Sequence, residues 1–302
     1  MKISREWFVN APWGKIALIS WGNPQGKPIL LVHGRQDSAA TFIPLLEFLP
    51  DDYYYIGIDL PGHGKSDALP IGTALTRFFF VVVVDMVVKE LNLKEFYYIA
   101  HSMGSEIGLF YNAIYPGKIK KLILLDAGPA LQRLVIYNFP QYYLFYIKYY
   151  SDYHKKNVDD RIYTEHQAIR AVMKARDMTE DQAKLILSRN LIKIGEDKYR
   201  LSWDRRTKDL VPTNYPPEQY YKLFSKVPPT LYISANQSFG DFYKEGKQII
   251  DDLILKLQQN VQYFTVLRVD GTHDVHFTHP ERFSKELCAF LDKDFGDLKS
   301  KL

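Results

Sequence analysis

A serine in the right setting for nucleophilic chemistry, Ser102, lies in the segment AHSMG (100–104), directly after the apolar run Phe96–Ile99. A strand, a sharp turn and a helix in this order expose a serine hydroxyl at the edge of a sheet. Small residues beside the serine permit the tight turn, and Ala100 stands here where glycine is usual. We therefore expect Ser102 to be a nucleophile and the backbone N–H of Met103 to face the oxyanion of an acyl-transfer reaction.

A second N–H donor for that oxyanion is expected from the segment His33-Gly34-Arg35, which follows the apolar run Lys27–Val32. Hydrolases that carry their nucleophile on a strand–turn–helix take one donor from the loop after an earlier strand. The backbone N–H of Arg35 is our candidate for this role.

The general base is expected late in the chain, because this arrangement of residues runs in the order nucleophile, acid, histidine. His273 fits, since it follows the last apolar run, Tyr263–Val269. His63, in Gly62-His63-Gly64, lies before the nucleophile and is interpreted as structural.

Two aspartates are candidates for the acid that orients His273. Asp126 ends the apolar run Ile119–Leu125, and Asp241 follows the run Thr230–Ile233 after a longer loop. Both lie between Ser102 and His273, so the order along the chain does not separate them. We favour Asp241, because an acid that orients the base must sit on a segment that reaches it, and keep Asp126 as the alternative.

No metal site or cofactor is expected. His276 and His279 have a spacing seen in metal sites, but no acidic or cysteine ligands join them with a defined spacing. Acyl transfer by serine and histidine needs no cofactor.

Three segments together resemble the α/β-hydrolase superfamily, and within it the serine hydrolase-like, kraken-type proteins. The segment HGRQDSAATF (33–42) is similar to the HGWLDNAxSF segment of that group, with Arg35 where tryptophan is usual. The segment GTHDVH (271–276) resembles its GNHxVH segment, and Ser234–Asp241 resembles its acid loop. The resemblance covers nearly the whole chain.

The resemblance implies a fold of eight mostly parallel strands with a helical cap, and a hydrolase with a Ser-His-Asp triad. It places an aspartate at Asp241, which adds to the preference for that residue. It implies no particular substrate.

The rest of the chain fits an α/β fold. Apolar runs of strand length alternate with segments of helical length, which indicates a parallel sheet covered by helices on both faces. The remaining run of strand length is Tyr53–Asp59. The segments of helical length are Thr76–Leu91, Ser105–Tyr115, Lys244–Gln259 and Pro280–Leu291.

Residues 130–227 interrupt this alternation, because they contain no clear strand. Thr164 and Thr179, each with a glutamine three residues later, are typical of residues that open helices. We therefore predict a hydrolase core of residues 1–129 and 228–302, with a helical cap, or lid, inserted at 130–227. Within it, Tyr137 to Tyr153 holds seven tyrosines and two phenylalanines, which fit either packing or the lining of a pocket.

Composition excludes several classes of protein. The 302 residues are 46% hydrophobic and 25% charged, with a net charge of +4, as in ordinary globular proteins. The basic residues are spread along the chain, so we expect no nucleic-acid partner. The most apolar run, Phe78–Val84, is too short to span a membrane. The one cysteine, Cys288, cannot form a disulfide within the chain, which suits a reducing compartment.

The sequence ends in Ser300-Lys301-Leu302, a tripeptide that a peroxisomal import receptor recognises when it is C-terminal. We therefore expect a peroxisomal protein that is also present in the cytoplasm, with the import receptor as a partner.

These features predict a serine hydrolase that cleaves a carboxylic ester or thioester through an acyl-enzyme. The peroxisomal signal suggests a fatty acyl compound as the substrate. The alternative is a catalytically silent member of the fold that acts as a binding or scaffold protein. The presence of Ser102, His273 and a candidate acid favours the enzyme.

Overall fold

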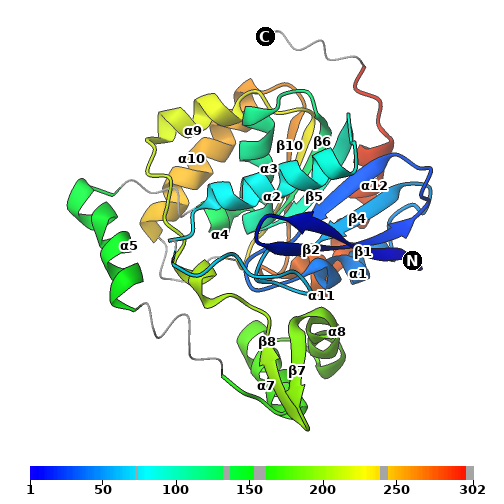
Figure 1. Cartoon of the computed structure of the whole chain (residues 1–302). Coiled ribbons are helices and arrows are strands. Elements are labelled where there is room, and N and C mark those ends of the chain that lie inside the picture. Colours follow the sequence, from blue (N-terminus) through cyan, green and yellow to red (C-terminus); the bar gives the residue numbers. More distant parts are fainter. Residues whose placement is uncertain (73, 132–136, 153–160, 239–243, 297–302) are drawn as a thin grey trace.

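The computed structural model describes the chain except for residues 73, 132–136, 153–160, 239–243 and 297–302 (Figure 1). Two features of the sequence analysis therefore lie outside the described residues, namely Asp241 and the terminal tripeptide Ser300-Lys301-Leu302. Among the helices that the structure does describe, none has the length and apolar character that crossing a membrane requires.

The centre of the molecule is an eight-stranded sheet in the order β1-β2-β4-β3-β5-β6-β9-β10. From β4 to β10 in this order, neighbouring strands are parallel. The β1–β2 and β2–β4 pairs are antiparallel. The predicted fold class, an eight-stranded and mostly parallel sheet with helices, is confirmed. The strands are β1 (Ile3–Ala11), β2 (Gly14–Gly22), β3 (Pro28–Val32), β4 (Tyr54–Ile58), β5 (Phe96–His101), β6 (Ile119–Leu125), β9 (Thr230–Ala235) and β10 (Phe264–Val269).

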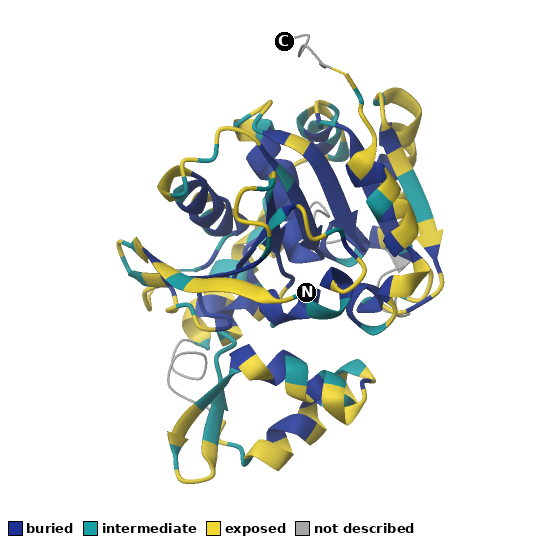
Figure 2. Cartoon of the chain, turned by 90° about the vertical axis from the view of Figure 1, so that its right-hand side faces the viewer, coloured by how far each residue is buried: buried dark blue, intermediate teal, exposed yellow. Residues whose placement is uncertain are grey.

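Helices cover both faces of the sheet (Figures 1 and 2). Alternate residues of β3 face opposite sides, as in any strand: Leu30 and Val32 join one hydrophobic cluster, and Ile29 and Leu31 join the other. The first cluster also takes side chains from α2 (Arg77–Glu90), α3 (Met103–Ile114), α9 (Pro217–Phe224) and α10 (Lys244–Asn260). The second takes them from η1 (Ala39–Phe42), α1 (Ile43–Leu46), α11 (Val275–Thr278) and α12 (Ser284–Asp292), which follows the short turn η5 (Pro280–Arg282).

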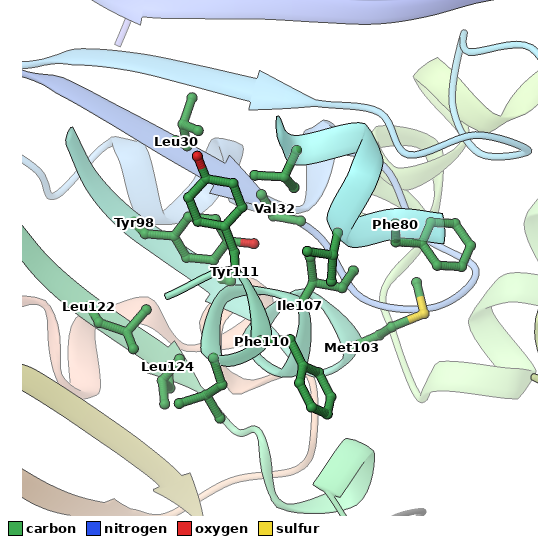
Figure 3. Packing of buried hydrophobic residues seen from close by; sticks show 14 of the residues in the cluster. Leu30, Val32, Phe80, Tyr98, Met103, Ile107, Phe110, Tyr111, Leu122 and Leu124 are labelled. Atoms are coloured by element: carbon green, nitrogen blue, oxygen red, sulfur yellow. The ribbon is translucent and has the colours of Figure 1, made fainter. Parts of the chain in front are cut away.

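The packing of α3 matters for function, because this helix begins one residue after Ser102. Ile107 and Phe110 of α3 belong to the same buried cluster as Tyr98 of β5 and Leu124 of β6 (Figure 3). At Gly108, a Cβ atom would lie 2.4 Å from the ring of Tyr98, so glycine permits the close approach of helix and sheet. Each large apolar side chain buried here stabilises the fold by about 1.5–3 kcal/mol. The start of α3 is therefore held firmly against the ends of the strands.

The chain between β6 and β9 leaves the sheet and returns to it; we call residues 130–227 the insertion. Thr164 and Thr179 form capping boxes at the starts of their helices, as predicted. The expectation that this region lacks strands is wrong, because β7 (Leu191–Gly195) and β8 (Lys198–Leu201) form a hairpin. The remaining elements of this part of the chain are α4 (Gly128–Leu131), α5 (Phe139–Ser151), α7 (Glu165–Arg176), α8 (Glu180–Asn190) and η3 (Arg205–Asp209).

The tyrosine-rich helix α5 lies apart from the sheet (Figure 1). Tyr149 is its buried residue. Phe139, Tyr143, Leu144 and Ile147 are exposed. Neither packing nor the lining of a pocket describes this outer face, which is open to solvent.

Candidate active site

Ser102 occupies the turn between β5 and α3, with backbone angles of φ 49° and ψ −115°. A residue with a side chain rarely adopts a positive φ, and such strain is common at functional sites. Gly104 makes the turn possible, because a Cβ atom there would lie 2.1 Å from the carbonyl oxygen of Val32. The turn predicted from the sequence is thus present, and it holds Ser102 at the carboxyl end of the sheet.

His273 meets Ser102 from the loop after β10. Its Nε2 atom lies 2.9 Å from Ser102 Oγ. The side chain of His273 is about one-third exposed, at 32%. The structure therefore brings together the two residues that the sequence pairs as nucleophile and base, with His273 partly exposed and Ser102 buried.

The carboxylate that contacts His273 is that of Asp126. Its Oδ2 atom lies 2.5 Å from His273 Nδ1, and its Oδ1 atom accepts the backbone N–H of Ala235 at 3.0 Å. Ser238 also donates its hydroxyl to Oδ2. Asp126 is almost fully buried, so these donors hold the carboxylate in one orientation.

The sequence favoured Asp241 over Asp126, and the structure makes the alternative the partner of His273. Asp241 lies outside the described residues. Asp126 can contact His273 because of its position in the sheet. Strand β6 is the direct neighbour of β5, so the first residue after β6 lies beside the nucleophile. No long loop is needed to bring an acid to the histidine.

The segment that carries Arg35 lies against the nucleophile. A Cβ atom on Gly34 would lie 3.1 Å from Ser102 Cβ and 2.9 Å from His101 Nδ1. Arg35 is therefore next to a residue that touches the turn, and Met103 is the first residue of α3. Both expected N–H donors sit on the two chain segments that meet at Ser102, and the side chain of Arg35 is exposed.

Comparison with protein families agrees with this geometry. Residues 27–280 match the model of the alpha/beta hydrolase fold. The chain belongs to this family. It is 28% identical over 293 residues to human serine hydrolase-like protein 2, covering 93% of this chain and 91% of the relative. A serine hydrolase-like protein of the zebrafish Danio rerio is also 28% identical, over 98% of this chain and 91% of the relative.

Several solved structures share the fold of this chain. A hypothetical protein of Pseudomonas aeruginosa superposes with a TM-score of 0.76 at 20% identity, covering 95% of this chain and 97% of the other. The thioesterase domain from the curacin biosynthetic pathway superposes with a TM-score of 0.73, also at 20% identity, covering 95% and 99%. These structures show the same fold that the family match gives, an α/β-hydrolase.

In this α/β-hydrolase, two further histidines lie beside His273. The His101 ring stacks on that of His276, with centroids 3.8 Å apart, and lies 4.5 Å from the ring of His273. His101 Nε2 donates to the carbonyl oxygen of His273 at 3.0 Å. Burial lowers the pKa of His101 well below its usual range and that of His276 to about 3. Both rings are therefore neutral near pH 7.

Little in the sequence indicates that His101 and His276 form a pair. In the sequence His101 is a residue of the turn, and His276 belongs to a metal-like spacing and to the segment that resembles GNHxVH. In the structure His276 bonds to Thr41 Oγ1 at 2.7 Å, while His279 lies 3.2 Å from Glu281. His276 and His279 therefore have separate environments.

One group of described residues has the composition of a metal site, namely Asp37, His101 and His276, whose polar atoms lie within 4.8 Å of one another. The two imidazoles are only 27° from parallel, so their lone pairs do not converge on one point. The carboxylate of Asp37 is paired with Arg176 at 2.9 Å. The group is therefore better explained by ring stacking and an ion pair.

His63 takes the structural position that the sequence suggests. It is fully buried, its Nδ1 atom bonds to the carbonyl oxygen of Pro61 at 3.0 Å, and its ring lies 5.1 Å from that of His33. These contacts hold the turn after β4.

Proposed function

We propose that this protein is a hydrolase of carboxylic esters or thioesters that works through an acyl-enzyme on Ser102. The single observation that carries the proposal is the chain of hydrogen bonds from Ser102 Oγ to His273 Nε2 and from His273 Nδ1 to Asp126 Oδ2. A serine beside a histidine that is itself oriented by a buried carboxylate is the arrangement that activates a serine hydroxyl.

In the proposed mechanism, His273 Nε2 takes the proton of Ser102 as Oγ bonds to the substrate carbonyl carbon. The N–H groups of Met103 and Arg35 stabilise the negative oxygen. The tetrahedral intermediate then collapses, and the alcohol or thiol leaves with the proton from His273. Water attacks the acyl-enzyme with the same help from His273, releasing the carboxylic acid and restoring Ser102.

Asp126 has two tasks in this mechanism. It holds His273 with Nδ1 protonated, so that Nε2 is free to accept the proton of Ser102, and it stabilises the imidazolium that forms. The donors from Ala235 and Ser238 keep the carboxylate in place during these steps.

The substrate class is proposed from similar structures. The names of similar structures include a thioesterase domain and an E-2-(acetamidomethylene)succinate hydrolase, so the fold accommodates several acyl groups. We propose an ester or thioester, with a fatty acyl group as the first class to examine. A series of p-nitrophenyl esters from two to sixteen carbons would size the acyl site.

The test is labelling by a fluorophosphonate, which reacts with activated serines, followed by peptide mapping. We expect the label on Ser102, and its loss in Ser102→Ala. Ser188→Ala is a matched control, because Ser188 is an exposed serine of α8 remote in sequence from the site. Labelling that persists in Ser102→Ala, or folded wild-type protein that neither labels nor hydrolyses any ester, would overturn the proposal.

A further inference from the structure

A single side chain of the insertion joins two loops of the candidate active site. Arg176, at the end of α7, donates from Nη2 to Asp37 Oδ2 at 2.9 Å. It also binds Asp274 with two nitrogens, Nε at 3.0 Å and Nη2 at 2.5 Å. A guanidinium that binds a carboxylate through two nitrogens fixes its orientation as well as its charge.

The two carboxylates belong to the loops that carry Arg35 and His273. Asp37 belongs to residues 33–38, which we call the oxyanion loop, two residues after Arg35. Asp274 belongs to residues 270–276, which we call the base loop, directly after His273. Arg176 therefore bridges the loop that offers an oxyanion donor and the loop that carries the base.

Both carboxylates of this bridge are buried, which affects their pKa values. Asp37 is 1% exposed and Asp274 is 9% exposed. Burial alone would raise the pKa of Asp274, but the charge and hydrogen bonds of Arg176 hold it below its usual range. The pKa of Asp37 is raised by burial in spite of Arg176. Two buried carboxylates thus share one cation.

The insertion also docks by apolar contact onto α11, the helix that continues the base loop. Phe277 of α11 belongs to the hydrophobic cluster of the insertion, together with Ile169 and Val172 of α7. Arg176 is therefore carried to the two loops by a helix, α7, that is itself packed against Phe277 of α11.

We propose that Arg176 is a positioning residue that holds the oxyanion loop and the base loop in the relative placement required for acyl transfer. This inference rests on the proposed function. It makes the insertion part of the catalytic arrangement, in addition to any role in covering the site.

The chain offers a matched comparison in Arg189 of α8. This residue is also an arginine of the insertion that pairs with the core, at 2.7 Å from Asp59 and 2.6 Å from Glu6. Its carboxylate partners belong to neither the oxyanion loop nor the base loop. Arg189→Gln therefore removes an ion pair between insertion and core without breaking the bridge between the loops.

The pH dependence of kcat/KM gives a readout that loss of docking alone would not move. Its acidic limb reports the pKa of the base in the free enzyme. The charged and titratable groups around His273 are Asp126 after β6, His101 in β5, His276 in α11, and Asp274 with its partners Arg176 and Asp37. Arg176→Gln removes the positive charge of the guanidinium from the surroundings of His273, which favours the imidazolium. The acidic limb should then move to higher pH.

The experiment measures kcat, KM and the acidic limb with one p-nitrophenyl ester in wild type, Arg176→Gln, Arg189→Gln and Asp274→Asn. In Arg176→Gln we expect kcat to fall roughly 10- to 100-fold, as for a small misplacement of reacting groups, with KM little changed and the limb displaced upward. Asp274→Asn removes a negative charge, so its limb should move to lower pH. This second variant keeps the test open if Arg176→Gln does not fold. Arg189→Gln should leave the limb in place.

Equal losses of kcat in Arg176→Gln and Arg189→Gln, with unmoved acidic limbs, would overturn the inference and reduce Arg176 to a docking residue. A wild-type kcat in folded Arg176→Gln would overturn it as well. Wild-type protein without turnover or fluorophosphonate labelling would be a different result, because then the proposed function fails and the inference falls with it.

Discussion

Asp126 Oδ2 lies 2.5 Å from His273 Nδ1, and the same carboxylate accepts the backbone N–H of Ala235 at 3.0 Å through its other oxygen. Asp126 therefore links the end of β6 to the end of β9 and to the base loop in one contact set. The backbone of Asp126 has a φ of 46°, in the left-handed region that favours glycine, asparagine and aspartate. This bend turns the side chain across the ends of the strands toward His273.

Asp126→Asn should lower kcat by about 10³- to 10⁴-fold with little change in KM, because an amide can donate to Nδ1 and favour the wrong tautomer of His273. The measurement is steady-state hydrolysis of a p-nitrophenyl ester, with circular dichroism to confirm folding. Asp241→Asn is the control, and we expect near wild-type activity from it. A large loss of activity in Asp241→Asn, with near wild-type activity in Asp126→Asn, would identify Asp241 as the acid.

The identity of the acid could not be predicted from the sequence alone. Order along the chain placed both Asp126 and Asp241 between Ser102 and His273, and only the neighbour relation of β5 and β6 separates them. That relation is a property of the sheet order, which depends on long-range pairing. The stacking of His101 on His276 could not be predicted for the same reason, because the two rings lie 3.8 Å apart but 175 residues apart in the sequence.

Gly34→Ala should reduce kcat by roughly 10²-fold, the cost of a displacement of about 1 Å at a reacting group. The new methyl would lie 3.1 Å from Ser102 Cβ and 2.9 Å from His101 Nδ1, so the oxyanion loop or the turn must move. Gly195→Ala is a matched control in the β7–β8 hairpin, where the nearest atom to the new methyl is 3.6 Å away. Equal activity of Gly34→Ala and wild type, measured with the same ester, would contradict the close packing of the two segments.

The fold itself was largely accessible from local patterns. The apolar run Ile119–Leu125 became β6 with the same bounds, and the capping boxes at Thr164 and Thr179 opened helices as predicted. Strands β1 and β2 and the β7–β8 hairpin were not predicted. Burial does not explain the miss of β2, whose side chains are buried from Ile16 to Trp21, but β1 and the hairpin were missed for a physical reason. The side chains of β1 are mostly exposed at the edge of the sheet, and the β7–β8 hairpin is only partly buried. Neither β1 nor this hairpin shows the continuous apolar run that identifies a buried strand.

Stability should fall between pH 6.5 and pH 4 because of buried neutral histidines. Burial lowers the pKa of His33 and of His63 to about 4 and that of His276 to about 3. Above pH 6.5 these histidines are neutral in both folded and unfolded chains and contribute no pH dependence. Below pH 6.5 the unfolded chain binds protons that the folded chain cannot, so the free energy of unfolding decreases as the pH falls.

Each such histidine should remove up to ~1.4 kcal/mol per pH unit across this window. His63→Gln tests the share of one of them, because glutamine does not titrate. We expect urea unfolding at pH 7, 6 and 5 to show a shallower loss of stability in His63→Gln than in wild type, even though the variant starts less stable at pH 7. Parallel curves would mean that His63 becomes protonated in the folded protein as readily as in the unfolded chain, and its burial beside His33 would then not keep it neutral.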